Sequence, residues 1–276
     1  MRPFTIYHLF RDAFSSFLQV LVDIIVNAAG PDMIFLLGAS LHRRRSESIF
    51  LDTAPSSRYL SDCFLLVLIN DPSNRELHEW QDKIETRCKR IIPVTAIVLE
   101  TATFKHWLDT GHRFADAVWE SASCIYDPNN LGGSFATGRV DANDANRENQ
   151  HAAGLAKARE FLAGSELFSA RKQKELAAFM LHQSAEQALR TIIKTGTGYH
   201  GNTHSLDRLI RYGSLISYSL RDIFPQNTEQ EKRLFNLLQK AYIEARYQPD
   251  YKISTEDLLL LMEKVKLVHE ILSGMD

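Results

Sequence analysis

Strand-like apolar segments are confined to the first half of this 276-residue sequence. Runs rich in Val, Ile, Leu and Phe at 33–37, 63–69 and 93–99 alternate with longer segments of helical periodicity, and a short run follows at 123–126. Strands that alternate with helices are typical of an α/β sheet. The sequence therefore predicts a mixed α/β sheet domain in the first half.

The helices of this half are expected at 4–28, 72–90 and 104–121. Gly30 and Pro31 follow the first of them and stop it, because proline cannot continue an α-helix. The second helix would begin at a proline, which suits the first helical turn since the N–H group that proline lacks is unpaired there. The expected order is helix, strand, strand, helix, strand, helix, strand.

The second half contains no convincing strand. Its periodicity predicts helices at about 147–164, 170–195, 205–219, 228–247 and 254–274. Ser205, Thr228 and Ser254 are suitable N-caps for the last three, because their side-chain oxygens accept hydrogen bonds from backbone N–H groups of the first turn. Short connections favour antiparallel neighbours. The expected architecture is an all-α antiparallel helical bundle.

Residues 129–146 differ from both flanking regions. They are rich in Gly, Asp and Asn and show no hydrophobic period, which indicates a linker. The sequence is thereby divided into an α/β domain at 1–128 and a helical bundle at 147–276. The alternative is that this segment is a long surface loop of the first domain.

The overall charge and the cysteine pattern argue against several classes of protein. The formal net charge is -2, so charge does not indicate nucleic-acid binding, which would need a local basic patch. Cys63, Cys88 and Cys124 are widely separated and odd in number, which argues against a disulfide framework or zinc cluster and favours the cytoplasm. The apolar segment at 14–29 is too polar to span a membrane, and no membrane association is expected.

Three segments of the second half, in this order and spacing, resemble the HEPN family of small helical bundles, which occurs in prokaryotes and eukaryotes. They are 177–190, 203–209 and 241–251. The resemblance favours a homodimer that associates through the bundle. It also favours a HEPN cleft, for which the candidate residues are His182, Glu186, Arg190, Arg246 and Tyr247.

The cleft candidates come from two helices. His182, Glu186 and Arg190 follow one another at intervals of four residues, so they lie along one stripe of a helix. This stripe is either the wall of a polar cleft or an intrahelical ladder of ion pairs. Arg246 and Tyr247 end a later helix, where an arginine complements the helix terminus and a tyrosine offers a ring on which a nucleotide base can stack.

Many HEPN proteins resemble metal-independent ribonucleases, which carry an arginine, four to six further residues and then a histidine. The second half of this chain contains no such spacing, since Arg190 and His200 are too far apart. The one match, from Arg2 to His8, lies outside the bundle. Ribonuclease activity is therefore disfavoured.

The first half resembles a nucleotidyltransferase domain, a type of domain that commonly accompanies HEPN domains. The shared outline is a strand, a small-residue turn containing Gly38 and Ser40, and a second strand that begins after Asp62. The resemblance implies that Gly38 and Ser40 bind a nucleoside triphosphate and that Asp62 binds Mg²⁺. Arg43 and Arg44 follow the turn, and they either grip phosphates or form a solvated charge run. The combined layout is similar to that of kanamycin nucleotidyltransferases.

Phe64 stands where the nucleotidyltransferase pattern has its second acid. Asp62 and Phe64 are two residues apart on a strand and share a face, and one carboxylate cannot supply the oxygen ligands of two Mg²⁺ ions. Glu100, after the third strand, is the remaining acid on these strands. Asp62 and Glu100 are thus the catalytic candidates, but the pattern favours a domain that has lost its chemistry.

The leading hypothesis is a nucleotide-binding protein, with a catalytically degenerate nucleotidyltransferase domain and a HEPN domain that lacks the ribonuclease motif. A nucleotide or nucleotide-bearing ligand, with Mg²⁺ for a nucleoside triphosphate, would bind between the domains. The first alternative is an active enzyme that transfers a nucleoside monophosphate to a small molecule, protein or RNA. The second is a prokaryotic toxin–antitoxin or stress-defence interaction module.

Overall fold

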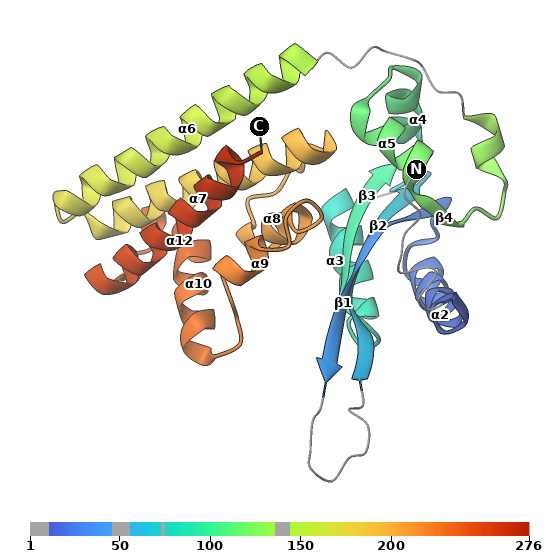
Figure 1. The fold of residues 1–276 in the computed structure, drawn as a ribbon, viewed down its shortest axis with the longest axis horizontal. Helices are drawn as coiled ribbons and strands as arrows, with labels where there is room; N and C mark the ends of the chain where they lie inside the picture. Colours follow the sequence, from blue (N-terminus) through green and yellow to red (C-terminus); the bar gives the residue numbers. More distant parts are fainter. Residues whose placement is uncertain (1–10, 46–55, 73–74, 136–143, 276) are drawn as a thin grey trace, which may run out of the picture. The chain divides into compact units, whose positions relative to one another are not determined.

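The computed structural model divides the chain into two compact units, Met1–Val140 and Asp141–Asp276. The first is built on a β-sheet and the second consists of helices (Figure 1). The backbone is described for residues 11–45, 56–72, 75–135 and 144–275. Side chains are described for residues 17–40, 62–72, 75–135 and 147–275.

The sheet of the first unit has four strands in the order β3-β2-β1-β4. They are β1 (Met33–Arg45), β2 (Ser56–Ile69), β3 (Val94–Glu100) and β4 (Ser123–Tyr126). Strands β2 and β3 are parallel, whereas β1 is antiparallel to both β2 and β4. The mixed sheet predicted from the sequence is confirmed.

The helices of the sheet unit are α2 (Arg11–Ala29), α3 (Leu77–Cys88), α4 (Thr101–Asp109) and α5 (Arg113–Ser121), followed by the 3-10 helix η1 (Leu131–Ser134). The prediction of one helix at 104–121 is wrong, because Gly111 has a φ of 67° and this left-handed conformation separates α4 from α5. Helix α3 begins at Leu77 and not at Pro72, whose carbonyl accepts a hydrogen bond from Trp80 at 3.1 Å.

One face of the sheet packs against α2 and α3. Leu65 and Val67 of β2 belong to the same buried cluster as Leu21 of α2 and Ile84 of α3. These strand residues are separated by two positions, which places them on one face of β2. This apolar layer is the main core of the sheet unit.

The opposite face of the sheet carries a smaller aromatic group. Phe35 of β1 lies 5.8 Å from Phe104 of α4 and 6.2 Å from Trp119 of α5, measured between ring centres. The alternation along β2 places Asp62 and Phe64 on this face, and both side chains are buried. The acid and the ring that replaces its expected partner are therefore on the same side, as predicted.

The outer strand β3 is protected by side chains of α3. Gln81 donates to the carbonyl oxygen of Ala96, and the Ala96 N–H donates to Glu85 Oε1 at 3.1 Å. An edge strand presents unpaired backbone groups that can recruit other strands. Two side chains one helical turn apart thus satisfy both polar groups of one edge residue.

The second unit is an all-α bundle, as predicted. Its helices are α6 (Asp144–Ala170), α7 (Lys174–Thr197), α8 (Leu206–Gly213), α9 (Leu220–Ile223), α10 (Glu229–Ala241), α11 (Glu244–Tyr247) and α12 (Thr255–Ser273). Ser205, Thr228 and Ser254 cap α8, α10 and α12, each accepting a bond from a backbone N–H three residues on. The predicted cap residues are confirmed.

The segment predicted as a linker contains regular structure at both ends. Residues 131–134 form η1, where the Asp127 carboxylate accepts hydrogen bonds from the N–H groups of Leu131 and Gly132 at 2.9 and 3.0 Å. At the other end, α6 already begins at Asp144. Residues 136–143 lie outside the described residues.

Candidate functional site

A buried carboxylate on α7 organises the main polar cluster of the bundle. Glu186 lies one helical turn before Arg190, whose Nε is 3.0 Å from Glu186 Oε1. The Glu186 side chain is 9% exposed, so this ion pair is largely shielded from water. The pair predicted from the four-residue spacing is confirmed, and Arg190 stabilises the charge of the carboxylate.

A histidine from the segment before α8 completes the contacts of this carboxylate. His204 Nδ1 lies 3.0 Å from Glu186 Oε1 and 3.1 Å from Oε2, so the ring N–H donates to both oxygens. Arg190 Nη2 donates to the Thr203 carbonyl at 2.9 Å and ties the same segment to α7. A carboxylate accepts and does not donate, so Nδ1 carries the ring hydrogen in this contact, and Nε2 is the nitrogen of the half-exposed His204 ring that does not contact Glu186.

His182 lies one turn before Glu186 and is fully buried. Burial lowers the pKa of His182 to about 3, with further lowering by His204 and Arg246 against an opposing contribution from the His204 backbone. The ring is therefore neutral at neutral pH, and its 3.7 Å approach to Glu186 Oε2 is not an ion pair there. His182 belongs to the floor of the cluster and is not exposed in a cleft.

Tyr242, between α10 and α11, stacks against both histidines. Its ring centre lies 4.4 Å from that of His204 with an interplanar angle of 14°, and 5.2 Å from that of His182 with an angle of 29°. These near-parallel stacking contacts help to fix the orientation of the two imidazole rings. The aromatic ring thus links α7, the segment before α8 and the end of α10.

Arg246 of α11 is surrounded by aromatic rings. Its guanidinium carbon lies 4.8 Å from the ring centres of Phe179 and Tyr242 and 4.9 Å from that of Tyr247. Its Nε donates to the Tyr242 carbonyl at 2.7 Å, and no ion pair joins it to any residue in the described part of the chain. Tyr247 is 69% exposed. An exposed cation that forms no ion pair with the described residues therefore lies beside an exposed aromatic ring.

These side chains form one site, called the Glu186 cluster, which consists of His182, Glu186, Arg190, His204, Tyr242 and Arg246. Arg190 balances the charge of Glu186, whereas Arg246 leaves the cluster with excess positive charge. A cation with flat aromatic neighbours suits a ligand that combines an anionic group with a planar ring. The buried carboxylate positions the other groups and is not itself placed to meet an anion.

A family comparison assigns this part of the chain. Residues 153–275 match the model of the HEPN domain. Residues 153–275 form a HEPN domain. The resemblance predicted from three sequence segments is confirmed, and every residue of the Glu186 cluster lies inside the matched range of the HEPN domain.

A search of solved structures returned a nucleotidyltransferase-like protein from Exiguobacterium sibiricum 255-15. The similarity covers 89% of this chain and 71% of that chain, with 12% sequence identity and a TM-score of 0.32. Similarity at this level supports no assignment of function. A comparison with curated proteins gave no match.

Two residues of the Glu186 cluster were not among the cleft residues predicted from the sequence. His204 lies within the second HEPN-like segment and Tyr242 within the third, but neither has a regular spacing to Glu186 along the chain. Their roles follow from contacts 18 residues apart for His204 and Glu186. Their position inside the segments that resemble the HEPN family is the one sequence feature that points to these two residues.

In the sheet unit, the prediction of a turn at Gly38 and Ser40 is wrong. Both residues lie within β1, where Gly38 pairs with Phe64 and Ser40 with Asp62. Shifts in register occur between Leu36 and Gly38 and again after Ser40, and a small residue such as glycine accommodates a β-bulge. These small residues, which the sequence places in a turn, instead lie beside two register shifts of a continuous strand.

The proposed pairing of Asp62 with Glu100 is contradicted by the strand register. Cys63, next to Asp62, pairs with Val94, whereas Ile69 at the far end of β2 pairs with Glu100. Asp62 and Glu100 are thus about seven residues apart along the parallel strands, or about 23 Å. These two carboxylates cannot hold one metal ion between them.

The remaining predictions for the sheet unit concern basic residues near its strands. Arg43 and Arg44 lie on β1, opposite Arg58 and Ser57 of β2. The side chains of Arg43 and Arg44 are not described, and the Arg2–His8 match lies outside the described residues.

No group of three or more His, Cys, Asp or Glu residues suited to a metal ion occurs in the part of the chain that the structure describes.

The two buried thiols of the sheet unit are not placed for nucleophilic chemistry. Burial raises the pKa of Cys63 to about 12, with a further contribution from Asp62. Burial likewise raises the pKa of Cys88 to about 11. Both thiols therefore stay protonated and act as apolar core groups.

Among the described residues, no helix is both long enough and apolar enough to cross a membrane.

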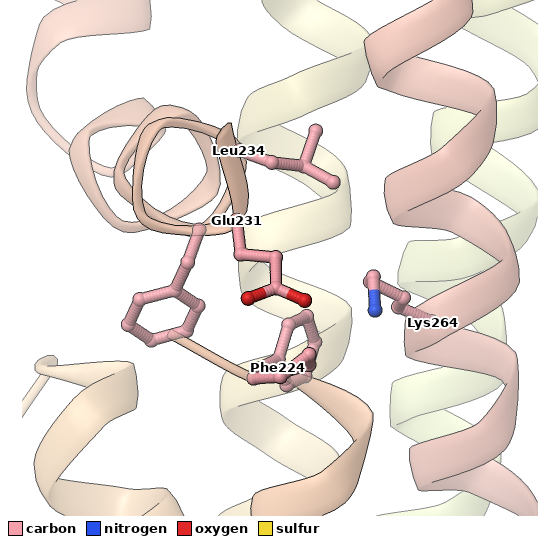
Figure 2. A pocket seen from close by; sticks show the side chains of 6 residues that line it. Phe224, Glu231, Leu234 and Lys264 are labelled. Atoms are coloured by element: carbon pink, nitrogen blue, oxygen red, sulfur yellow. The ribbon is translucent and has the colours of Figure 1, made fainter. Parts of the chain in front are cut away.

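The bundle also has a small pocket away from the Glu186 cluster. Its lining is shown in Figure 2 and consists of Phe224, Pro225, Glu231, Leu234, Phe235 and Lys264. The cavity volume is about 20 Å³, which holds about one water molecule. Glu231 is committed to the capping box of α10, where it accepts backbone N–H bonds from Asn227 and Thr228 at 2.9 Å. This pocket is too small for a nucleotide.

Proposed function

We propose that this protein binds a nucleotide, or a ligand that carries one, at the Glu186 cluster of its HEPN domain. The observation that carries the proposal is Arg246, an exposed guanidinium without a counter-ion among the described residues and within 5 Å of three aromatic ring centres. A nucleotide presents the two complementary features, an anionic phosphate and a flat base. Charge-assisted hydrogen bonds from arginine are among the strongest contacts to phosphate.

The proposed binding mode gives each group of the cluster a distinct task. Arg246 pairs with a phosphate, and the base stacks on the exposed ring of Tyr247, a contact worth about 1–3 kcal/mol. With Nδ1 donating to Glu186, His204 presents Nε2 as an acceptor for a ribose hydroxyl. Glu186 and Arg190 hold His204 and its segment in position without touching the ligand.

The test is equilibrium binding of ATP, GTP and AMP, with and without Mg²⁺, by calorimetry and thermal shift. Arg246→Ala and Tyr247→Ala are each expected to weaken binding about tenfold, the equivalent of about 1.4 kcal/mol. Lys240→Ala is the matched control, since Lys240 is an exposed cation nearby in the sequence that already pairs with Glu244 at 3.2 Å. Absence of any thermal shift at millimolar nucleotide, or an equal loss in the control, would refute the proposal.

We propose further that the sheet unit is a catalytically degenerate nucleotidyltransferase-like domain. The buried Phe64 at the position of the second acid and the remote position of Glu100 support this. If the unit binds a nucleoside triphosphate with Mg²⁺, Asp62, Gly38 and Ser40 are the residues that would contact it.

The alternative of an active nucleotidyltransferase is favoured by one observation, the direct pairing of Ser40 with the buried Asp62. It predicts transfer of label from α-labelled ATP to an acceptor, abolished by Asp62→Asn. Glu100→Gln is the control and should leave transfer unchanged, because Glu100 lies at the other end of the strands. Absence of transfer by the unmodified chain would contradict this alternative, and transfer that survives Asp62→Asn would exclude Asp62 as its catalytic residue.

A partner protein would place the chain in a prokaryotic toxin–antitoxin or stress-defence module of the cytoplasm. The only support for this proposal is that HEPN domains commonly accompany nucleotidyltransferase domains. Copurification from the native cell tests for the partner, and light scattering of the purified chain tests for a homodimer through the bundle. A monomer with no copurifying protein would contradict both.

A further inference from the structure

Helix α3 carries a group of cations around one tryptophan. Arg75 lies just before the helix, and Lys83 and Arg87 lie on it, one helical turn apart. The Arg75 guanidinium carbon is 5.2 Å and the Lys83 Nζ is 4.6 Å from the ring centre of Trp80, and both are cation–π distances. Arg75, Trp80, Lys83 and Arg87 are together called the Trp80 patch.

Trp80 anchors this patch to the sheet unit. Its partly buried ring packs against the apolar core, and its Nε1 donates to the Pro72 carbonyl at 3.1 Å. A ring held in this way restricts the positions of the two long cationic side chains that lie over it. Restriction before binding reduces the entropy that a ligand must overcome.

The three cations form no ion pair with the described residues. Glu79 lies four residues before Lys83, a spacing at which an acid and a lysine can pair on a helix, yet Lys83 lies over the Trp80 ring. Arg87 lies four residues after Lys83, where a like charge destabilises a helix. Partial burial lowers the pKa of Lys83, and Arg75 and Arg87 lower it further. The three charges thus repel one another, and a bound anion would offset this repulsion.

The helix dipole accounts for only one of these cations. Arg87 lies in the last turn of α3, where a cation complements the negative end of the dipole. Lys83 lies in the middle of the helix, and Arg75 precedes its positive end, where a cation is unfavourable. Position along the helix therefore does not explain Arg75 and Lys83.

Acids on the same helix limit the kind of anion that fits. Glu76, Glu79 and Asp82 are exposed close to the cations along the chain. A long nucleic acid or a flat anionic membrane that lay across α3 would also meet these carboxylates, and like charges opposed in this way disfavour binding. A short anionic segment can meet the Trp80 patch alone. Tryptophan and arginine are also enriched among the residues that dominate binding between proteins.

We propose that the Trp80 patch binds a short acidic segment of a partner protein. Carboxylates of that segment would supply the counter-ions of Arg75, Lys83 and Arg87. The formal net charge of the whole chain is -2, so the chain as a whole offers an acidic segment no attraction, and binding depends on the local patch. This inference goes beyond nucleotide binding by the HEPN domain and does not depend on it.

The experiment measures binding of a short fluorescein-labelled peptide, in which every second residue is Asp or Glu, to the full chain. Anisotropy is followed in buffer of low ionic strength, where screening is weak. The patch variant Arg75→Gln/Lys83→Gln/Arg87→Gln should bind the peptide at least about tenfold more weakly, because three charge-assisted contacts are lost. A peptide with Asn and Gln in place of the acids should not bind the unmodified chain.

The matched control removes three other exposed cations that also form no ion pair with the described residues. It is the variant Lys105→Gln/Lys157→Gln/Arg171→Gln, which has the same net charge as the patch variant and should keep the affinity of the unmodified chain.

Glu79→Gln should change the affinity in the opposite direction. It removes an exposed acid one helical turn from Lys83 and should tighten peptide binding about twofold, as expected for one like-charge repulsion at this spacing. Glu160→Gln, at an exposed position of α6, is its control and should leave the affinity unchanged.

Three results would overturn the proposal. They are absence of acidic-peptide binding by the unmodified chain at millimolar peptide, an equal loss of affinity in the patch variant and its control, and tighter binding of an oligonucleotide or of phosphatidylserine vesicles than of the peptide. Circular dichroism and tryptophan fluorescence establish that the variants are folded. Nucleotide binding, measured in parallel, should be unchanged in the patch variant, so failure of one proposal is distinguishable from failure of the other.

Discussion

The sheet unit and the helical bundle use buried polar groups in different ways. In the sheet unit the main core is apolar, and the buried polar side chains described there are Asp62, Gln81 and Thr95. In the bundle, buried polar groups lie within the helix interfaces, and they include His151, Ser165, His182, Ser184, Glu186, Thr191 and His269. In a sheet, hydrogen bonds between the backbones of neighbouring strands fix how the strands align. Helices bond their backbone groups internally, so side-chain contacts must fix how packed helices align.

Ser184 illustrates what such groups do in the bundle. Its hydroxyl donates to the Ala158 carbonyl of α6 at 2.9 Å and accepts from Nε2 of His269 of α12 at 2.8 Å. One buried hydroxyl therefore joins three helices, and a shift of any helix by a single turn would break a bond. The comparison teaches that apolar burial holds the sheet unit together, while polar contacts also specify how the bundle helices align.

The two units can be followed separately in one experiment. The three tryptophans, Trp80, Trp107 and Trp119, all lie in the sheet unit. Tryptophan fluorescence therefore reports unfolding of the sheet unit, and far-ultraviolet circular dichroism is dominated by the helical bundle. Urea titrations with both probes test the comparison without separating the units.

The largest effect is expected from Glu186→Ala. The substitution removes the partner of the shielded Arg190 and releases His204, and loss of one member of a buried ion pair costs about 3–5 kcal/mol. Circular dichroism should show this loss while tryptophan fluorescence is unchanged. Glu263→Ala is the control, because its pair with Lys266 is exposed and worth at most about 1 kcal/mol. A cost for Glu186→Ala as small as that of the control would show that the cluster is not structural.

Two glycines of α6 provide a matched pair of substitutions. A Cβ at Gly154 would overlap Thr191 of α7, lying 2.6 Å from its Cγ2, whereas a Cβ at Gly164 would meet Met180 at 3.7 Å. Gly154→Ala should destabilise the bundle by about 1–3 kcal/mol through overpacking. Gly164→Ala should stabilise it by about 0.5–1 kcal/mol, since alanine favours the helix. Equal effects of the two substitutions in urea titrations would contradict the close approach of α6 to α7.

The buried His182 predicts a dependence of bundle stability on pH. Burial lowers its pKa to about 3 in the folded chain, so the unfolded chain takes up the proton first as the pH falls below about 6.5. The contribution of neutral His182 to the free energy of unfolding of the bundle is therefore fully present above about pH 6.5, and it is lost progressively as the pH falls toward 3. From pH 7 to pH 5 the loss is about 2 kcal/mol.

His182→Gln should flatten this part of the pH dependence when bundle unfolding is followed by circular dichroism. The fluorescence transition of the sheet unit serves as the internal control and should keep the same pH dependence in both proteins. A variant whose bundle loses as much stability between pH 7 and pH 5 as the unmodified chain would show that another group is responsible.

The smallest effect is expected at the edge of the sheet. Gln81→Ala removes the bond to the Ala96 carbonyl of β3 and should cost about 1 kcal/mol, measured by tryptophan fluorescence. Thr86→Ala, at an exposed position of α3, is the control and should not destabilise the unit. Should Gln81→Ala also leave the stability unchanged, the carbonyl at the edge is satisfied by water and the apolar core alone holds α3.

Features that depend on near neighbours in the chain were predictable from the sequence. The alternation of strands and helices, the caps at Ser205, Thr228 and Ser254, and the pairing of Glu186 with Arg190 all follow from repeats of two to four residues. Within a helix or strand, such spacings determine geometry directly. The HEPN segments were likewise recognisable because they lie in order along the chain.

Only the tertiary structure decided what each of these elements meets. Helix packing brought His204 and Tyr242 to the Glu186 cluster, and strand register separated Asp62 from Glu100 and kept Gly38 within a strand. Contacts between distant segments depend on register and packing, which no local repeat encodes. The amino-acid sequence by itself thus determined which elements form, and the packing of those elements determined which side chains share a site.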